Sequence, residues 1–210
     1  MNRPPTSPPP PPPLTEAEVA EAERELGVSF PAEYRAHLVG VSAGEGMARL
    51  QRGERGWWWS GKEQTRPDLL PLPFPHPDSY AAAEAELDAR EPQWEAFRDG
   101  PAAATAWNAW DAEYEEFQDR KTAGSVVLQE HGCGYATFLA LSGPLAGTMW
   151  WDGRASHDLI IPLSLDHEAG GRPATFAEWL QHDSWDLLPD WGRPNRSFPA
   201  GDSIATPACH

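Results

Sequence analysis

Residues 132–153, GCGYATFLALSGPLAGTMWWDG, constrain the fold more than any other part of this chain. Two apolar runs rich in aromatic residues are separated by Ser142, Gly143 and Pro144, and the second run ends at Asp152. Runs of this kind, bounded by turn-forming residues, predict two strands joined by a turn. The segment contains no catalytic motif, which favours a protein that binds over one that converts a substrate.

Two more apolar runs flank this pair, SVVLQE at 125–130 and LIIPL at 159–163. Their short connections favour antiparallel pairing, so residues 124–165 are predicted to form a meander of strands. A closing helix is predicted over 176–182, with Phe176, Trp179 and Leu180 on one face.

The N-terminal part is predicted to be helical. Thr15 and Glu18 have the spacing of a capping box, and Gly27 suits the residue that follows a helix, which together predict a helix over 15–26. A second helix is expected over 31–40 because Pro31 suits a first helical position. Its apolar face is predicted to contain Tyr34, Leu38 and Val41.

The middle of the chain divides into two parts. Residues 42–75 are rich in glycine and proline, which predicts an irregular loop interrupted by the three tryptophans at 57–59. Residues 78–120 are rich in helix-forming residues, with breaks at Pro92 and Gly100, and predict a helical insert.

These elements together predict an α+β fold. An N-terminal helical pair, the helical insert and the C-terminal helix are expected to pack on one mainly antiparallel, twisted sheet. A single domain is predicted over 14–188, between a Pro-rich disordered tail at 1–13 and a poorly ordered C-terminal tail at 189–210. The prolines at 8–13 predict a polyproline II segment, either a spacer or a ligand for a proline-binding groove.

The formal net charge of −16 narrows the classes of partner. Nucleic-acid binding needs clustered Lys and Arg, so direct binding to nucleic acid is disfavoured, as is binding to an anionic membrane surface. The charge favours association with a basic partner, although it also suits simple solubility.

Several features predict a cytoplasmic protein. No apolar run approaches the roughly 20 residues that span a bilayer, and prolines occupy the place of a signal peptide's apolar region. The two cysteines, Cys133 and Cys209, are too few for a disulfide framework and lack metal-ligand spacing, which fits a reducing compartment.

The order of these motifs resembles the SUKH superfamily. The segment LTEAEVAEAERELGVSFPAEYRAHL at 14–38 is similar to its N-terminal signature, in which an acidic helix leads through a Gly to an apolar-Pro pair, an acidic residue, an aromatic residue and a Leu. The residues that match this signature are Gly27, Phe30, Pro31, Glu33, Tyr34 and Leu38. Later similarities lie at 132–141, 147–152, 161–163 and 176–180.

This resemblance implies a non-catalytic protein-binding domain that needs no cofactor and no metal. The superfamily includes fungal cell-wall-synthesis regulators and bacterial immunity proteins that neutralise a cognate toxin, often a nuclease, by occluding it. A protein toxin is therefore the expected partner. A nuclease needs a basic surface, which an acidic inhibitor complements.

Two groups of residues are candidates for partner binding. Residues 76–122 contain twelve Asp or Glu against four Lys or Arg, half of the net charge of the chain. The acidic candidates in this region are Glu84, Glu86, Asp88, Asp111, Glu113, Glu115 and Glu116. The second group is Trp57, Trp58 and Trp59, because alternation along an extended segment leaves at least one ring exposed. The alternative for the acidic residues is an ordinary solvated helix face. The alternative for the three tryptophans is a loop that covers the core.

Catalytic and metal sites are less favoured by the sequence. His131 and Cys133 share a strand face and could supply a base and a nucleophile, but no orienting residue is identifiable. His157, Asp158, Asp166 and His167 match no known metal-ligand spacing. Two other functions stay open: a carbohydrate-active enzyme with a Trp-lined cleft, and a regulatory scaffold that recruits partners through its polyproline tail.

Overall fold

The computed structural model describes residues 10–60, 65–167 and 171–189, and it confirms an α+β fold. Its six α-helices are α1 (Glu16–Leu26), α2 (Ala32–Gly40), α3 (Pro77–Ala89), α4 (Gly100–Arg120), α5 (Arg154–His157) and α6 (Phe176–Trp179) within these residues. The strands are β1 (Leu50–Gly53), β2 (Gly56–Trp59), β3 (Ser125–Gly132), β4 (Tyr135–Ala140), β5 (Met149–Asp152) and β6 (Ile160–Pro162). Three 3-10 turns are η1 (Pro67–Leu69), η2 (Trp94–Ala96) and η3 (Ser184–Leu187).

The strands form two antiparallel sheets. The predicted meander is confirmed as a four-stranded sheet in the order β3-β4-β5-β6. A separate hairpin of β1 and β2 lies in the region predicted to be irregular, so that prediction is wrong for residues 50–59. Gly53 and Gly56 flank the tight turn of this hairpin, which explains why the glycines are compatible with strands.

The helix signals near the N-terminus are confirmed in detail. The Thr15 hydroxyl accepts a hydrogen bond from the Glu18 backbone N–H, and the Glu18 carboxylate accepts one from the Thr15 N–H. Gly27 ends α1 in a left-handed conformation, with φ of 70°. Helix α2 ends at Gly40, and Val41 leaves the helix and is 56% exposed, so its predicted place on the apolar face is wrong.

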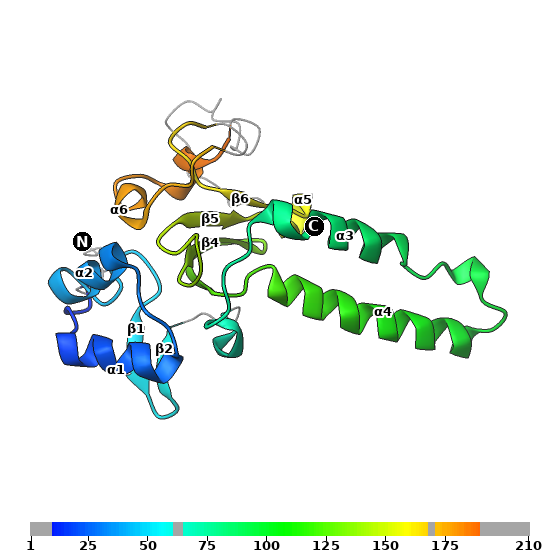
Figure 1. The fold of residues 1–210 in the computed structure, drawn as a ribbon, viewed down its shortest axis with the longest axis horizontal. Helices are drawn as coiled ribbons and strands as arrows, with labels where there is room; N and C mark the ends of the chain where they lie inside the picture. Colours follow the sequence, from blue (N-terminus) through cyan, green and yellow to red (C-terminus); the bar gives the residue numbers. More distant parts are fainter. Residues whose placement is uncertain (1–9, 61–64, 168–170, 190–210) are drawn as a thin grey trace, which may run out of the picture.

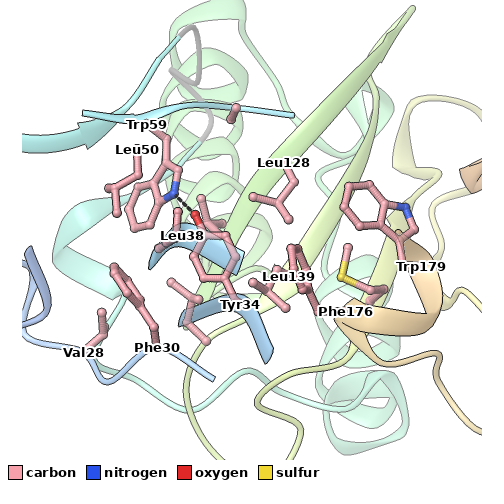
Figure 2. Packing of buried hydrophobic residues seen from close by; sticks show 14 of the residues in the cluster. Val28, Phe30, Tyr34, Leu38, Leu50, Trp59, Leu128, Leu139, Phe176 and Trp179 are labelled. Atoms are coloured by element: carbon pink, nitrogen blue, oxygen red, sulfur yellow. Dashed lines mark hydrogen bonds between the residues drawn. The ribbon is translucent and has the colours of Figure 1, made fainter. Parts of the chain in front are cut away.

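Both faces of the four-stranded sheet are buried. Trp150 and Trp151 are neighbours on β5, so their side chains point to opposite faces. Trp151 belongs to the larger core, which α1, α2, the β1–β2 hairpin and α6 cover (Figures 1 and 2). Trp150 belongs to a smaller core on the other face, where it packs against Phe74 with ring centroids 5.2 Å apart.

The C-terminal helix is shorter than predicted. Thr175 and Glu178 form a second capping box at the start of α6, and Phe176 and Trp179 are buried in the larger core. The helix ends at Trp179, and Leu180 is 42% exposed, so the prediction that Leu180 shares their face is not confirmed.

The predicted polyproline segment lies partly outside the described residues, which begin at residue 10. The backbone oxygen of Pro11 accepts a hydrogen bond of 2.8 Å from the Ser42 hydroxyl. The oxygen of Pro12 accepts one of 3.2 Å from the Ala43 N–H. These contacts place the last prolines against the chain that follows α2. The predicted C-terminal tail, apart from Pro189, lies outside the described residues.

Candidate partner-binding surface

Helices α3 and α4 form a helical hairpin, called here the arm (residues 77–120), which projects from the body at one end of the longest axis (Figure 1). Each helix begins with a defined cap. His76 precedes α3, and its Nδ1 accepts a hydrogen bond from the Asp78 N–H. The Asp99 carboxylate accepts one of 2.8 Å from the Ala102 N–H at the start of α4. The sequence prediction of a helical insert is confirmed.

Aromatic side chains form the contact between the two helices. The indole N–H of Trp110 on α4 donates a 3.0 Å hydrogen bond to the backbone oxygen of Leu87 on α3. Near the base, the rings of Tyr80 and Phe117 meet edge to face with centroids 6.1 Å apart. These rings are only half-buried. Burial nevertheless raises the pKa of the Tyr80 phenol.

Two ion pairs cross between the helices of the arm. Arg90 donates two hydrogen bonds, of 2.9 and 2.7 Å, to the carboxylate of Glu113, and these hydrogen bonds lower the pKa of Glu113. Lys121 is 2% exposed and pairs with Glu84. Both carboxylates therefore have a partner within the arm, although the Glu113 side chain is still 52% exposed.

The other acidic candidates are available to a partner to different degrees. Glu116 pairs with Arg120 one turn along α4. The remaining four are exposed and make no ion pair with any residue that the structure describes: Glu86, Asp88, Asp111 and Glu115. These four carboxylates, called here the open acidic residues, are the members of the predicted acidic face that no ion pair among the described residues engages.

The base of the arm is fixed to the sheet by Arg154. Its guanidinium donates to both carboxylate oxygens of Asp152 at 2.9 and 2.7 Å, and Asp152 is only 3% exposed at the end of β5. The same guanidinium donates a 2.8 Å hydrogen bond to the backbone oxygen of Gln118 on α4. A bidentate arginine is geometrically specific, so it sets the direction in which the arm leaves the body.

The three predicted tryptophans of β2 differ in exposure. Trp57 and Trp59 are buried in the larger core, whereas Trp58 is 46% exposed, as the alternation of a strand requires. The prediction that at least one ring is exposed is confirmed. The β1–β2 hairpin and the arm lie at opposite ends of the longest axis (Figure 1), so the structure does not bring the two predicted groups into one surface.

A further exposed tryptophan was not among the predicted candidates. Trp94 lies in η2, between the two helices of the arm, and is 57% exposed. The sequence signal was present, because Pro92 and Gly100 mark a break between helices. The arm therefore combines acidic sides with an aromatic tip.

A pocket of about 510 Å³ opens elsewhere, between the loop before β1, the end of β3 and η3. Its lining includes Gln129, Glu130, Asp183 and Trp185. The amide of Gln129 is engaged on both sides, since it donates to the Gly46 oxygen at 2.8 Å and accepts from the Ser184 hydroxyl at 3.2 Å. This pocket therefore brings two carboxylates and a tryptophan into one lining.

The structure gives His131 a packing role. Its ring lies against Trp151 with centroids 4.6 Å apart, and its Nε2 shares a 2.8 Å hydrogen bond with the Thr137 hydroxyl. Cys133 is disulfide-bonded and so supplies no thiolate for a Cys–His pair. A disulfide is also unusual in the reducing compartment that the cysteine count suggested.

The metal hypothesis gains no support from the part of the chain that the structure describes. Asp158, Asp166 and His167 are exposed, and no group of three or more metal-ligating side chains occurs among the described residues. None of the described helices combines the length and the apolarity needed to cross a bilayer.

Comparison with known proteins returns no match to a family model, to a curated protein or to a solved structure. The resemblance to the SUKH superfamily therefore stays a prediction from the sequence.

Proposed function

We propose that this chain is a non-catalytic protein-binding domain that occludes a basic partner, in the manner of an immunity protein that neutralises a toxin. The observation that carries the proposal is the arm. It projects from the body (Figure 1) and contains twelve Asp or Glu against three Lys or Arg.

The charge on the arm supports a basic partner. An acidic element that projects into solvent raises the rate of encounter with a positively charged surface. The same charge disfavours pairing of two copies of the chain arm to arm, because like charges repel. The open acidic residues are the ones that the arm does not use for its own stability.

The way the arm is held supports a steric mechanism. The Arg154 guanidinium ties its base to Asp152, and the pair between Arg90 and Glu113 joins the end of α3 to the middle of α4. A rigid projection loses little conformational freedom on binding, so more of the contact energy appears as affinity. Such a projection can block access to a partner's basic surface.

Two charge-reversal variants with the same change in net charge test the proposal. The arm variant contains Glu86→Lys, Asp111→Lys and Glu115→Lys. The body variant contains Glu45→Lys, Glu54→Lys and Asp166→Lys, which replace exposed carboxylates outside the arm. Tagged proteins are used to capture partners from lysate of the source cells, and a captured protein is then expressed alone and together with each variant.

We expect the wild type and the body variant to retain one basic protein and to suppress its toxicity, while the arm variant does neither. The association rate of the wild type should also fall as salt is added. Equal retention by the two variants would exclude the arm as the binding surface. If no protein partner were captured, the protein-binding function itself would be wrong.

A second candidate function is binding or conversion of a small ligand such as a carbohydrate. It rests on the pocket that places Glu130, Asp183 and Trp185 together, since sugars stack on tryptophan and carboxylates supply acid and base. A glycan-binding screen tests it with Trp185→Ala as the comparison variant. Loss of a glycan signal in that variant would favour this candidate, and absence of any signal would exclude it.

A further inference from the structure

The tip of the arm presents an exposed aromatic ring in a fixed position. Trp94 is 57% exposed in η2, in the segment that joins α3 to α4. The end of the arm is the part of the described chain that lies farthest from the body along the longest axis (Figure 1). An exposed tryptophan at such a point is the type of residue that dominates binding energy at protein interfaces.

Trp94 is held by a series of rings along α4. Its ring stacks on Trp107 with centroids 6.1 Å apart and an angle of 23°. Trp107 meets Trp110 edge to face at 5.8 Å, and Trp110 stacks on Tyr114 at 4.9 Å. One face of Trp94 is therefore in contact with Trp107. Because the ring is already positioned, a partner that binds it need not order it.

The indole N–H of Trp107 gives a second indication. Its Nε1 atom is buried and has no hydrogen-bond partner among the residues that the structure describes. Buried donors are nearly always paired in native proteins, so an unpaired one calls for an explanation. The stack therefore contains one buried donor that the arm itself leaves unpaired.

Charged residues flank Trp94 in the sequence of the tip. Glu91 and Glu95 are exposed before and after it, and Asp99 caps the start of α4. Arg98 is the exposed cation in the same segment. Carboxylates around an exposed indole favour a planar cation, because a guanidinium stacks on the ring while its N–H groups reach the carboxylates.

We propose that Trp94 is the specificity-determining anchor of the arm and that it receives an arginine side chain of the basic partner on its exposed surface. The inference rests on the proposed function, in which the arm contacts a basic protein. It assigns the main aromatic contact to Trp94 and not to Trp58, the exposed tryptophan of β2. A second copy of this chain is an unsuitable occupant because both arms are acidic.

Hexa-arginine and hexa-lysine peptides are the probes, titrated into the full chain by calorimetry at low salt. Two tryptophan variants are matched in chemistry and similar in exposure: Trp94→Ala at the tip and Trp58→Ala on β2. Near-ultraviolet circular dichroism and thermal unfolding verify that both variants are folded. Trp94→Phe keeps an aromatic face, so it should restore most of the peptide affinity that Trp94→Ala loses through the absence of stacking.

We expect Trp94→Ala to weaken hexa-arginine binding by about threefold to tenfold and to change hexa-lysine binding less, while Trp58→Ala changes neither. Equal effects of the two tryptophan variants would overturn the inference, as would equal loss of both peptides in Trp94→Ala. The arm and body charge-reversal variants, titrated with the same peptides, distinguish failure of this inference from failure of the proposed function.

If the arm variant weakens peptide binding and Trp94→Ala does not, the arm binds cations without Trp94 and only this inference fails. If the arm variant and the body variant bind the peptides equally, both proposals fail.

Discussion

The indole N–H of Trp59 donates a 2.8 Å hydrogen bond to the phenol oxygen of Tyr34 inside the larger core (Figure 2). Both side chains are buried, at 3% and 0% exposure. The bond joins the β1–β2 hairpin to α2. The bond gives the Trp59 N–H an acceptor in a part of the core that is otherwise lined by apolar rings. Burial also raises the pKa of the Tyr34 phenol.

Tyr34→Phe should therefore destabilise the protein by about 1–3 kcal/mol, because the Trp59 N–H would stay buried without an acceptor. Urea unfolding measures the free energy of unfolding. Tyr114→Phe is the control, since its half-buried ring stacks on Trp110 and no hydrogen bond of its hydroxyl is found in the described chain. Equal losses in the two variants would show that the buried bond adds nothing specific.

The two ion pairs that cross between the two sides of the arm should differ in their contribution to stability. Glu84→Gln leaves the ammonium of Lys121 buried against the rings of Tyr80 and Phe117, with a predicted loss of about 2–3 kcal/mol. Glu113→Gln removes an exposed partner of Arg90 and should have little effect on the free energy of unfolding. Thermal unfolding of both variants checks this order, and a larger loss for Glu113→Gln would contradict it.

Gly124 should tolerate no side chain, because it lies where α4 meets β3 in a left-handed conformation. A Cβ atom at this position would come within 2.1 Å of the Leu72 backbone oxygen. We expect Gly124→Ala to cost about 2–5 kcal/mol, the sum of backbone strain and overpacking. Gly132 has a similar φ of 80° with open space around it, so Gly132→Ala should cost only about 1–2 kcal/mol. Urea unfolding compares them, and equal costs would rule out the steric clash.

His37 should make stability depend on pH. Burial lowers its pKa below the ordinary value of 6.5, although the charge of Glu45 opposes the shift. The unfolded chain therefore binds the proton more readily than the folded chain, and stability falls as the pH drops through 6.5 toward the folded-state pKa. Relative to His37→Leu, the wild type should lose stability between pH 7.5 and 5.5. Parallel urea curves at the two pH values test this, and identical pH dependence would contradict it.

Local signals predicted the helices well because their determinants are close in sequence. The capping box of Thr15 and Glu18 and the left-handed Gly27 depend only on nearby backbone groups, so they could be assigned without tertiary contacts. The β1–β2 hairpin escaped prediction for the opposite reason. Its glycines suggested a loop, and pairing of Leu50 with Trp59 across the turn is a property of two segments together.

The candidate site was only partly predictable. Composition identified the acidic insert and its helical character. It could not show that Glu84 faces Lys121, 37 residues away, or that Glu113 faces Arg90 across the hairpin. Nor could it rank Trp94 above the tryptophans of β2, since exposure depends on what packs over each ring.

The amino-acid sequence by itself determined the α+β class, the order of helices and strands in the meander, and the excess of negative charge near residues 76–122. These follow from local propensity, capping and composition. Only the tertiary structure decided that the acidic helices leave the body as an arm (Figure 1). It also decided which carboxylates remain open and that Trp94 is exposed in the turn between the two helices. Ion pairing and burial are set by distances between residues far apart in the chain, such as the contact of Arg154 with Gln118.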